Sequence, residues 1–312
     1  MARCFVTRPL PGGAQERLKT DHLVEAWKGR LPPSPADLKV RLRDAEGLLC
    51  MLTDRIDAQL IDAAPKLRAI SNYAVGTDNV DLDAATARGV PVGRTPDVLT
   101  ETTADFAFAL LLAAARRIVE GEIAVREGDW ITWEPGRWLG HDVHGATLGI
   151  VGFGRIGEAV ARRAQGFGMR VIHTSKSGGV PLEKLLAESD FVSIHAPLTA
   201  DTRGLIGEDE LRTMKPTAIL VNTSRGKIVD TRALETALRE GWIAAAALDV
   251  TDPEPLPPEH PLLEAPNILV VPHIASASHR TRHAMAEMAV ENLRAGLAGE
   301  RMPHCANPQV YD

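Results

Sequence analysis

Cysteine is scarce in this sequence. The 312 residues include only Cys4, Cys50 and Cys305, and no two of them form a C-x-x-C pair. An odd and sparse set of this kind excludes a disulfide-stabilised scaffold and a zinc site built from thiolates. It is also typical of a reducing compartment, so we expect the protein in the cytoplasm.

Long apolar runs and an excess of positive charge are missing as well. The longest apolar run, 104–115, contains Asp105 and is too short to cross a bilayer. The first residues include no apolar segment of signal-peptide length. With 35 basic and 41 acidic side chains, the net charge of −6 argues against wrapping nucleic acid. We therefore expect neither a membrane nor a nucleic-acid partner.

Short β-branched runs alternate with Ala- and Leu-rich stretches along most of the chain. This alternation predicts a parallel sheet with helices on both faces, and the length indicates two domains. We expect 100–280 to form a dinucleotide-binding domain, and 1–99 plus 281–312 to form a substrate-binding domain. Strands are predicted at 5–7, 47–52, 69–72, 147–151, 170–173, 191–195, 218–222, 244–249 and 268–271. The long helical windows are 102–117 and 278–298.

The strongest local motif is Gly152-Phe153-Gly154-Arg155-Ile156-Gly157, which follows a predicted strand and opens a predicted helix. In that context the first glycine permits a tight turn, the second allows a pyrophosphate to approach the backbone, and the third lets the helix pack closely. The helix N-terminus then offers N–H groups to the phosphates. The motif predicts a dinucleotide site.

The next predicted strand ends without the acidic residue that usually binds the ribose hydroxyls of NAD. Ser175, Lys176 and Ser177 stand there, and no acid precedes Glu183. Hydroxyls and an ammonium suit a 2′-phosphate, so we expect NADPH to be preferred, with NADH possible.

Arg225, Glu254 and His273 each follow a different predicted strand. Ligands bind at the carboxyl ends of strands in an open α/β sheet, so these side chains are expected at one site. They suit reduction of a 2-oxo acid: the guanidinium binds the carboxylate, the imidazole protonates the carbonyl oxygen, and the carboxylate orients the imidazole. His279 and His283 have metal-compatible spacing but no third ligand, so no metal site is expected.

Three of the five tryptophans lie within 130–138. Two interpretations stay open from the residues alone. The segment either covers a helix of its own chain, or forms an arm that buries its indoles against another subunit.

The glycine motif, Arg225, Glu254 and His273, in this order and spacing, resemble the D-isomer-specific 2-hydroxyacid dehydrogenase family. The resemblance extends over nearly the whole chain. Within that family, 71–81, 248–257 and 272–282 are similar to the glyoxylate/hydroxypyruvate reductases. The resemblance implies two Rossmann-like or flavodoxin-like α/β domains with parallel sheets around a cleft. It also implies a homodimer in which an arm crosses to the partner.

The resemblance assigns further roles. It places Val75, Gly76, Leu52 and Ser276 at the substrate, and Trp138 at the neighbouring subunit's pocket. The implied cofactor contacts are the glycine motif with Arg155 and Ile156, the residues Ser175, Lys176 and Ser177, and Pro197, Thr223 and Asp249. The implied reaction converts glyoxylate and hydroxypyruvate to glycolate and D-glycerate. The alternatives are another D-2-hydroxyacid dehydrogenase, such as a 3-phosphoglycerate dehydrogenase, and a dinucleotide-sensing corepressor without enzymatic activity.

Overall fold

The computed structural model describes residues 1–312, which divide into two compact units. One unit is Met1–Leu99 with Ala277–Asp312, and the other is Thr100–Ser276. The second break lies at Ala277 rather than at the expected residue 281. The reason is that Ser278 caps helix α11 (His279–Ala298) by accepting a hydrogen bond from the Thr281 N–H, so the whole helix belongs to the first unit.

The first unit is built on a five-stranded parallel sheet in the order β2-β1-β3-β4-β5. β1 lies between β2 and β3, so the strand order reverses beside the first strand of the unit. The strands are β1 (Arg3–Val6), β2 (Leu23–Ala26), β3 (Gly47–Cys50), β4 (Ala69–Asn72) and β5 (Val92–Gly93). The helices are α1 (Ala14–Asp21), α2 (Pro35–Leu42), α3 (Ala58–Asp62), α4 (Leu82–Ala87) and α11, with 3-10 turns at Pro11–Gly13 and Pro308–Tyr311.

Helix α11 returns from the end of the chain to complete this unit. Its buried face, including Met285, Ala289 and Leu293, packs with residues of β1 and β4 in one apolar core. The Ser71 hydroxyl also donates to the Ala289 carbonyl at 2.8 Å. Burial of a large apolar side chain such as Met285 or Leu293 stabilises the unit by about 1.5 to 3 kcal/mol, which holds the chain end in place.

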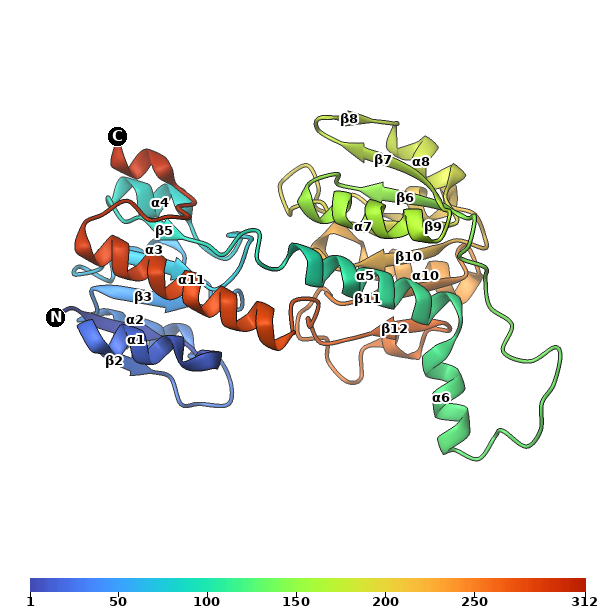
Figure 1. Ribbon diagram of the computed structural model, residues 1–312, viewed down its shortest axis with the longest axis horizontal. Helices are drawn as coiled ribbons and strands as arrows, with labels where there is room; N and C mark the ends of the chain where they lie inside the picture. Colours follow the sequence, from blue (N-terminus) through green and yellow to red (C-terminus); the bar gives the residue numbers. More distant parts are fainter. The chain divides into compact units, whose positions relative to one another are not determined.

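The second unit contains a seven-stranded sheet in the order β12-β11-β10-β9-β6-β7-β8, with helices on both faces (Figure 1). Its strands are β6 (Thr147–Val151), β7 (Arg170–Ser175), β8 (Gly178–Gly179), β9 (Phe191–Ile194), β10 (Ile219–Asn222), β11 (Ala245–Leu248) and β12 (Ile268–Val270). Its helices are α5 (Thr100–Ala115), α6 (Ile118–Arg126), α7 (Arg155–Gly166), α8 (Leu182–Glu188), α9 (Glu208–Thr213) and α10 (Thr231–Glu240), with 3-10 turns at Gly226–Ile228 and Pro261–Glu264.

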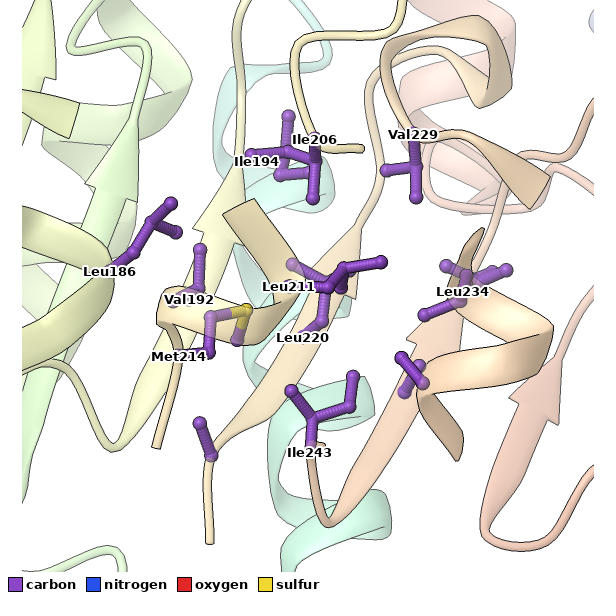
Figure 2. Close-up of a cluster of buried hydrophobic side chains, with 14 of the residues drawn as sticks. Leu186, Val192, Ile194, Ile206, Leu211, Met214, Leu220, Val229, Leu234 and Ile243 are labelled. Carbon is purple, nitrogen blue, oxygen red and sulfur yellow. The ribbon is translucent and has the colours of Figure 1, made fainter. Parts of the chain in front are cut away.

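Each face of this sheet has its own core. Helices α8, α9 and α10 cover one face, where Leu186, Leu211 and Leu234 meet the strand residues Val192 and Leu220 (Figure 2). Helices α5 and α7 cover the other face. Strands β9, β10 and β11 are buried at every position, as expected for strands covered on both sides.

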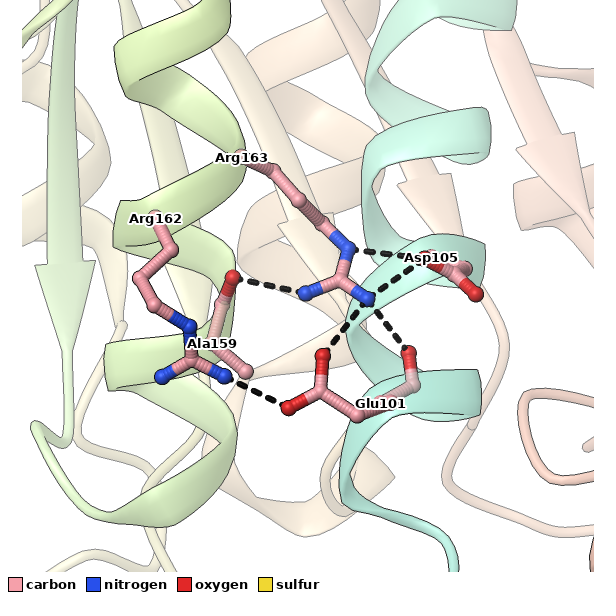
Figure 3. Close-up of polar contacts among 5 residues, drawn as sticks. All are labelled: Glu101, Asp105, Ala159, Arg162 and Arg163. Carbon is pink, nitrogen blue, oxygen red and sulfur yellow. Dashed lines mark hydrogen bonds and ion pairs between the residues drawn. The ribbon is translucent and has the colours of Figure 1, made fainter.

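An ion-pair network joins α5 to α7. The Arg163 guanidinium donates to both Glu101 and Asp105 of α5 and to the Ala159 carbonyl of its own helix (Figure 3). Arg162 adds a 2.5 Å contact to Glu101. The network fixes the start of the second unit to the helix that follows the glycine motif.

The predicted fold class is confirmed, with three local differences. The short strands β2, β5 and β8 were not expected, and β8 pairs antiparallel with β7, so the sheet is not wholly parallel. The long helix predicted over 102–117 ends at Ala115. A second helix, α6, follows it, because Arg117 adopts a left-handed φ of 51° that breaks one helix and starts another. None of the helices is long and apolar enough to span a membrane.

Candidate active site

The glycine motif forms the turn between β6 and α7. Gly152 has a φ of 92°, and a Cβ there would lie 2.4 Å from the Ala196 nitrogen. A Cβ on Gly157 would lie 2.4 Å from the Gly152 oxygen, so the helix packs directly on the turn. Around Gly154 no heavy atom lies within 4 Å of a Cβ position. The backbone there can approach a phosphate, which is the arrangement a dinucleotide requires.

Aromatic stacking fixes this turn against the neighbouring strand. The Phe153 ring stacks on His173 of β7, with centroids 3.9 Å apart and an interplanar angle of 18°. The Gly152 N–H also donates to the Thr174 carbonyl at 2.8 Å. Arg155, at the first position of α7, is exposed beside the turn, and Ile156 is partly buried.

The turn after β7 is a tight hairpin that holds Ser175, Lys176 and Ser177. The Ser175 hydroxyl donates to the Gly178 carbonyl at 3.1 Å and lies 3.0 Å from the Ser177 hydroxyl. The Lys176 ammonium forms a 2.9 Å ion pair with Asp201, which belongs to the loop after β9. Hydrogen bonding to Lys176 lowers the pKa of Asp201. An acid therefore reaches this turn from a segment that the sequence did not connect with it.

The loop after β9 carries Pro197 at an exposed position. It begins at His195, whose Nε2 lies 2.8 Å from the Ser193 hydroxyl. Burial lowers the pKa of His195 to about 4, so the ring is neutral near pH 7. His195 is therefore suited to a structural role rather than to proton donation.

The central contact of the site joins His273 to Glu254. The His273 Nδ1 lies 2.6 Å from the Glu254 Oε1, and both side chains are partly exposed. His273 has a left-handed φ of 53°, an uncommon conformation for a residue with a side chain. Its N–H donates to the carbonyls of Asp249 and Val271 at 2.9 and 3.0 Å, which holds the unusual turn. Strained backbone of this kind is concentrated at functional sites.

Asp249 stabilises the same turn through hydrogen bonds to its backbone. Its buried carboxylate accepts hydrogen bonds from the N–H groups of Ile274, at 2.6 Å, and Ala275, at 2.9 Å. Burial raises the pKa of Asp249, although both N–H groups act in the opposite direction. The family resemblance implies a cofactor contact for Asp249, and the structure adds that its carboxylate fixes the backbone directly after His273. Each carboxylate oxygen can accept more than one hydrogen bond, so Asp249 can hold the backbone and also contact a cofactor.

Arg225 lies at the end of β10 on a turn shaped by Asn222. The Asn222 amide donates to the Arg225 carbonyl at 2.9 Å and accepts from the Ser224 N–H at 3.0 Å. A Cβ on Gly226 would lie 2.0 Å from the Thr251 backbone, so this turn packs against the segment that leads to Glu254. The structure thus brings the Arg225 and Glu254 loops together. Sequence reasoning missed Asn222, although its place at the end of a buried strand was a usable signal.

Thr223 supplies a test of whether these residues fit a cofactor. Its hydroxyl is buried and has no hydrogen-bond partner in the protein. Buried hydroxyls are nearly always paired, so an unpaired one directly after β10, at the carboxyl edge of the sheet, is suited to a polar ligand. Together with the glycine turn, it makes the edge of the sheet a fitting site for a dinucleotide. Nowhere do three or more His, Cys, Asp or Glu side chains group so as to hold a metal ion.

In the other unit, a polar network connects the Leu52 turn with the Val75-Gly76 turn. The Asn79 amide donates to the carbonyls of Met51 and Asp54, at 3.1 and 3.0 Å. Its oxygen accepts from Asn72 at 2.9 Å, and the same Asn72 nitrogen donates to the Gly76 carbonyl at 2.9 Å. The two turns are therefore held together by two asparagines.

The buried carboxylate of Asp54 also stabilises the Leu52 turn. Asp54 accepts from the Met51 N–H at 2.7 Å and from the Thr7 hydroxyl. Burial raises the pKa of Asp54, while these hydrogen bonds act against the rise. The loop that carries Leu52 is thus fixed at both ends.

Two further residues, Ser276 and Trp138, were also predicted to belong to the site. Ser276 is the last residue of its unit and is partly buried. Trp138 lies on the arm after α6, with the guanidinium groups of Arg117 and Arg137 at 5.8 and 4.9 Å from its ring centroid. The structure does not connect Trp138 with the other site residues of its unit.

Known proteins resemble the chain closely. Residues 108–275 match the family described as D-isomer specific 2-hydroxyacid dehydrogenase, NAD binding domain. A glyoxylate reductase of Korarchaeum cryptofilum is 55% identical, over 99% of this chain and 96% of that protein. A Thermus thermophilus protein of known structure gives a TM-score of 0.91 at 51% identity, covering 97% of this chain and 99% of that one. The NADPH-dependent glyoxylate/hydroxypyruvate reductase of Sinorhizobium meliloti, solved with NADP and malonate, gives 0.87 at 34% identity, covering 99% and 98%.

Proposed function

Because the chain belongs to the D-isomer specific 2-hydroxyacid dehydrogenase family, we propose that it reduces glyoxylate and hydroxypyruvate to glycolate and D-glycerate with a nicotinamide dinucleotide as cofactor. The 2.6 Å contact between His273 and Glu254, among strand ends that also carry Arg225 and the glycine turn, carries this proposal. In this proposal, the unit Thr100–Ser276 binds the dinucleotide and the other unit contributes to substrate binding.

His273 is the proposed acid. When bound, the reduced nicotinamide supplies a hydride to the carbonyl carbon of the substrate. The His273 ring donates a proton to the carbonyl oxygen as negative charge develops there. The Nδ1 contact with Glu254 orients the ring and leaves Nε2 for the substrate. The turn held by Asp249 keeps the ring in place.

Arg225 is the proposed carboxylate-binding residue. A planar guanidinium can form two parallel hydrogen bonds with the substrate carboxylate and so fix its orientation. The backbone N–H groups of Val75 and Gly76 would donate to the same carboxylate, and Leu52 would line the pocket. Ser276 would lie beside His273. The asparagine network supports these assignments, because it holds the Leu52 and Gly76 turns as one piece.

Strand ends of the second unit would hold the cofactor. The turn formed by Gly152, Gly154 and Gly157, with Arg155 and Ile156 at the start of α7, would place its backbone N–H groups at the pyrophosphate. The unpaired Thr223 hydroxyl and the exposed Pro197 would lie along the dinucleotide. Asp249 would accept from the nicotinamide carboxamide with its spare lone pairs.

NADPH is the proposed preferred cofactor. No acid stands among Ser175, Lys176 and Ser177, so a 2′-phosphate would meet two hydroxyls and an ammonium there. The reductase of Sinorhizobium meliloti, which shares the fold at 34% identity, is NADPH-dependent. NADH remains usable in this proposal, because a missing acid does not exclude it.

A homodimer is proposed through α6 and the arm that follows it. This part carries many exposed apolar side chains, a composition typical of protein interfaces. They include Ile118, Ile123, Val125, Trp130, Ile131, Trp133 and Leu139. In the dimer, Trp138 would reach the partner's pocket. Light scattering should give twice the chain mass, and a monomer at micromolar concentration would contradict the assignment.

The three free cysteines support the cytoplasm as the proposed location.

A turnover assay tests the function. Purified protein should oxidise NADPH when glyoxylate or hydroxypyruvate is added, and His273→Ala should abolish most of this activity. Absence of oxidation with either substrate and either cofactor would refute the proposal.

A further inference from the structure

Two oppositely charged side chains approach each other beside the glycine turn. Lys176 follows β7 and Asp201 follows β9, the two strands that flank β6 on either side. All three strands are parallel, so their carboxyl ends meet at one edge of the sheet. Lys176 and Asp201 form a 2.9 Å ion pair there, although 25 residues separate them. The pair lies at the edge where the proposed ribose site is found.

The loop that holds Asp201 is a fixed turn. The Thr202 hydroxyl donates to the Pro197 carbonyl at 2.6 Å and accepts from the Thr199 N–H at 2.8 Å. The Arg203 N–H donates to the Thr199 carbonyl at 3.1 Å. On the other side, the hairpin of β7 and β8 fixes Lys176, and Gly178 and Gly179 supply the positive φ values that the hairpin needs. The two charges therefore face each other from two ordered segments.

We propose that Asp201 is a specificity-determining residue that competes with the cofactor 2′-phosphate for Lys176 and so lowers the preference for NADPH. The inference rests on the proposed use of NADPH and goes beyond it. An anion that binds Lys176 must either displace Asp201 or share the ammonium with it. The carboxylate also repels a phosphate dianion held nearby, whereas the uncharged ribose hydroxyls of NADH meet no such repulsion.

The expected effect is modest, because both side chains are largely exposed, at 79% and 72%. An exposed ion pair of this kind changes an equilibrium constant by a factor of only about 1.4 to 5. Removing the carboxylate also removes its repulsion of the phosphate. Asp201→Asn should therefore raise the NADPH-to-NADH ratio about three- to tenfold at low salt, and the gain should shrink as salt screens the charges.

Nicotinamide fluorescence titrations of the full-length protein provide a test that needs no turnover. The dissociation constants of NADPH and NADH would be measured for wild type, Asp201→Asn, Lys176→Ala and the double variant. Glu208→Gln is the matched control, because Glu208 forms an exposed 2.9 Å ion pair with Arg212 on α9 of the same unit. We expect Asp201→Asn to tighten NADPH binding, Glu208→Gln to change neither constant, and the effect of Asp201→Asn to shrink when Lys176 is absent.

The outcomes separate this inference from the proposed NADPH preference. An unchanged ratio in Asp201→Asn would overturn the role of Asp201. A ratio that rises only because NADH binding weakens would overturn it too, since Asp201 would then serve the ribose rather than compete for Lys176. By contrast, a Lys176→Ala variant with the wild-type ratio would refute the proposed phosphate contact itself.

Discussion

Asn79 offers a sharp test of how the substrate turns are held. Its amide donates to the carbonyls of Met51 and Asp54 and accepts from Asn72, which in turn donates to Gly76. Asn79→Ala removes the two bonds to the Leu52 turn and the link to Asn72. Each of these three lost hydrogen bonds costs about 0.5 to 1.5 kcal/mol, so the free energy of unfolding should fall by about 1.5 to 4.5 kcal/mol.

Loss of stability alone would not identify a positioning role, so a matched control is needed. Asn307 is fully buried in the same unit, and its side chain also forms several hydrogen bonds, including those to Val92, Thr86 and Val90. None of these partners belongs to the proposed site. Asn307→Ala should therefore lose a similar amount of stability while the kinetics of glyoxylate reduction stay near wild type.

The kinetic assay compares the two variants under conditions in which both are folded. Asn79→Ala should raise the KM for glyoxylate at least about tenfold, because small displacements of orienting groups are costly. The dissociation constant of NADPH should not change, since the proposed cofactor contacts belong to the other unit. If Asn79→Ala kept a wild-type KM, or if Asn307→Ala raised it equally, Asn79 would have no positioning role.

The site residues and one buried histidine give four further predictions. His273→Ala should lower turnover about a hundredfold or more, and Glu254→Gln should lower it less, as measured by steady-state kinetics. Arg225→Lys keeps the charge but loses one charge-assisted hydrogen bond, so kcat/KM for glyoxylate should fall about tenfold to a hundredfold, and wild-type kinetics would exclude the role. Ser175→Asp should move the cofactor ratio toward NADH, and an unmoved ratio would show that this turn does not contact the ribose. The lowered pKa of His195, about 4, means that the unfolded chain binds a proton more readily than the folded one. Urea titrations should therefore show stability falling from pH 6.5 toward pH 4 by up to about 3 kcal/mol, and less so in His195→Gln.

Local patterns made much of this protein predictable. The glycine motif, its strand and its helix are contiguous, so their arrangement follows from spacing alone. The strands that end before Arg225 and His273 are nearly continuous apolar runs, which reveals both the parallel sheet and the edge where ligands bind. These features need no knowledge of distant contacts.

The features that escaped prediction depend on distant contacts or on very short elements. Asp201 approaches Lys176 only because β7 and β9 both flank β6, which the sequence does not state. Strand β5 is two residues long and gains its pairing from β4, so it has no periodicity to detect. The Asn79 network likewise connects two loops whose proximity exists only in the folded unit.

The central claim is reduction of glyoxylate by a nicotinamide cofactor at the His273 site. The most direct measurement is an initial-rate panel of glyoxylate, hydroxypyruvate, pyruvate and 3-phosphohydroxypyruvate with NADPH and with NADH, for wild type and His273→Ala. We expect glyoxylate and hydroxypyruvate to be reduced fastest, NADPH to be favoured, and His273→Ala to lose nearly all activity. A wild-type protein that oxidised neither cofactor with these two substrates, or that reduced 3-phosphohydroxypyruvate in preference to both, would contradict the account.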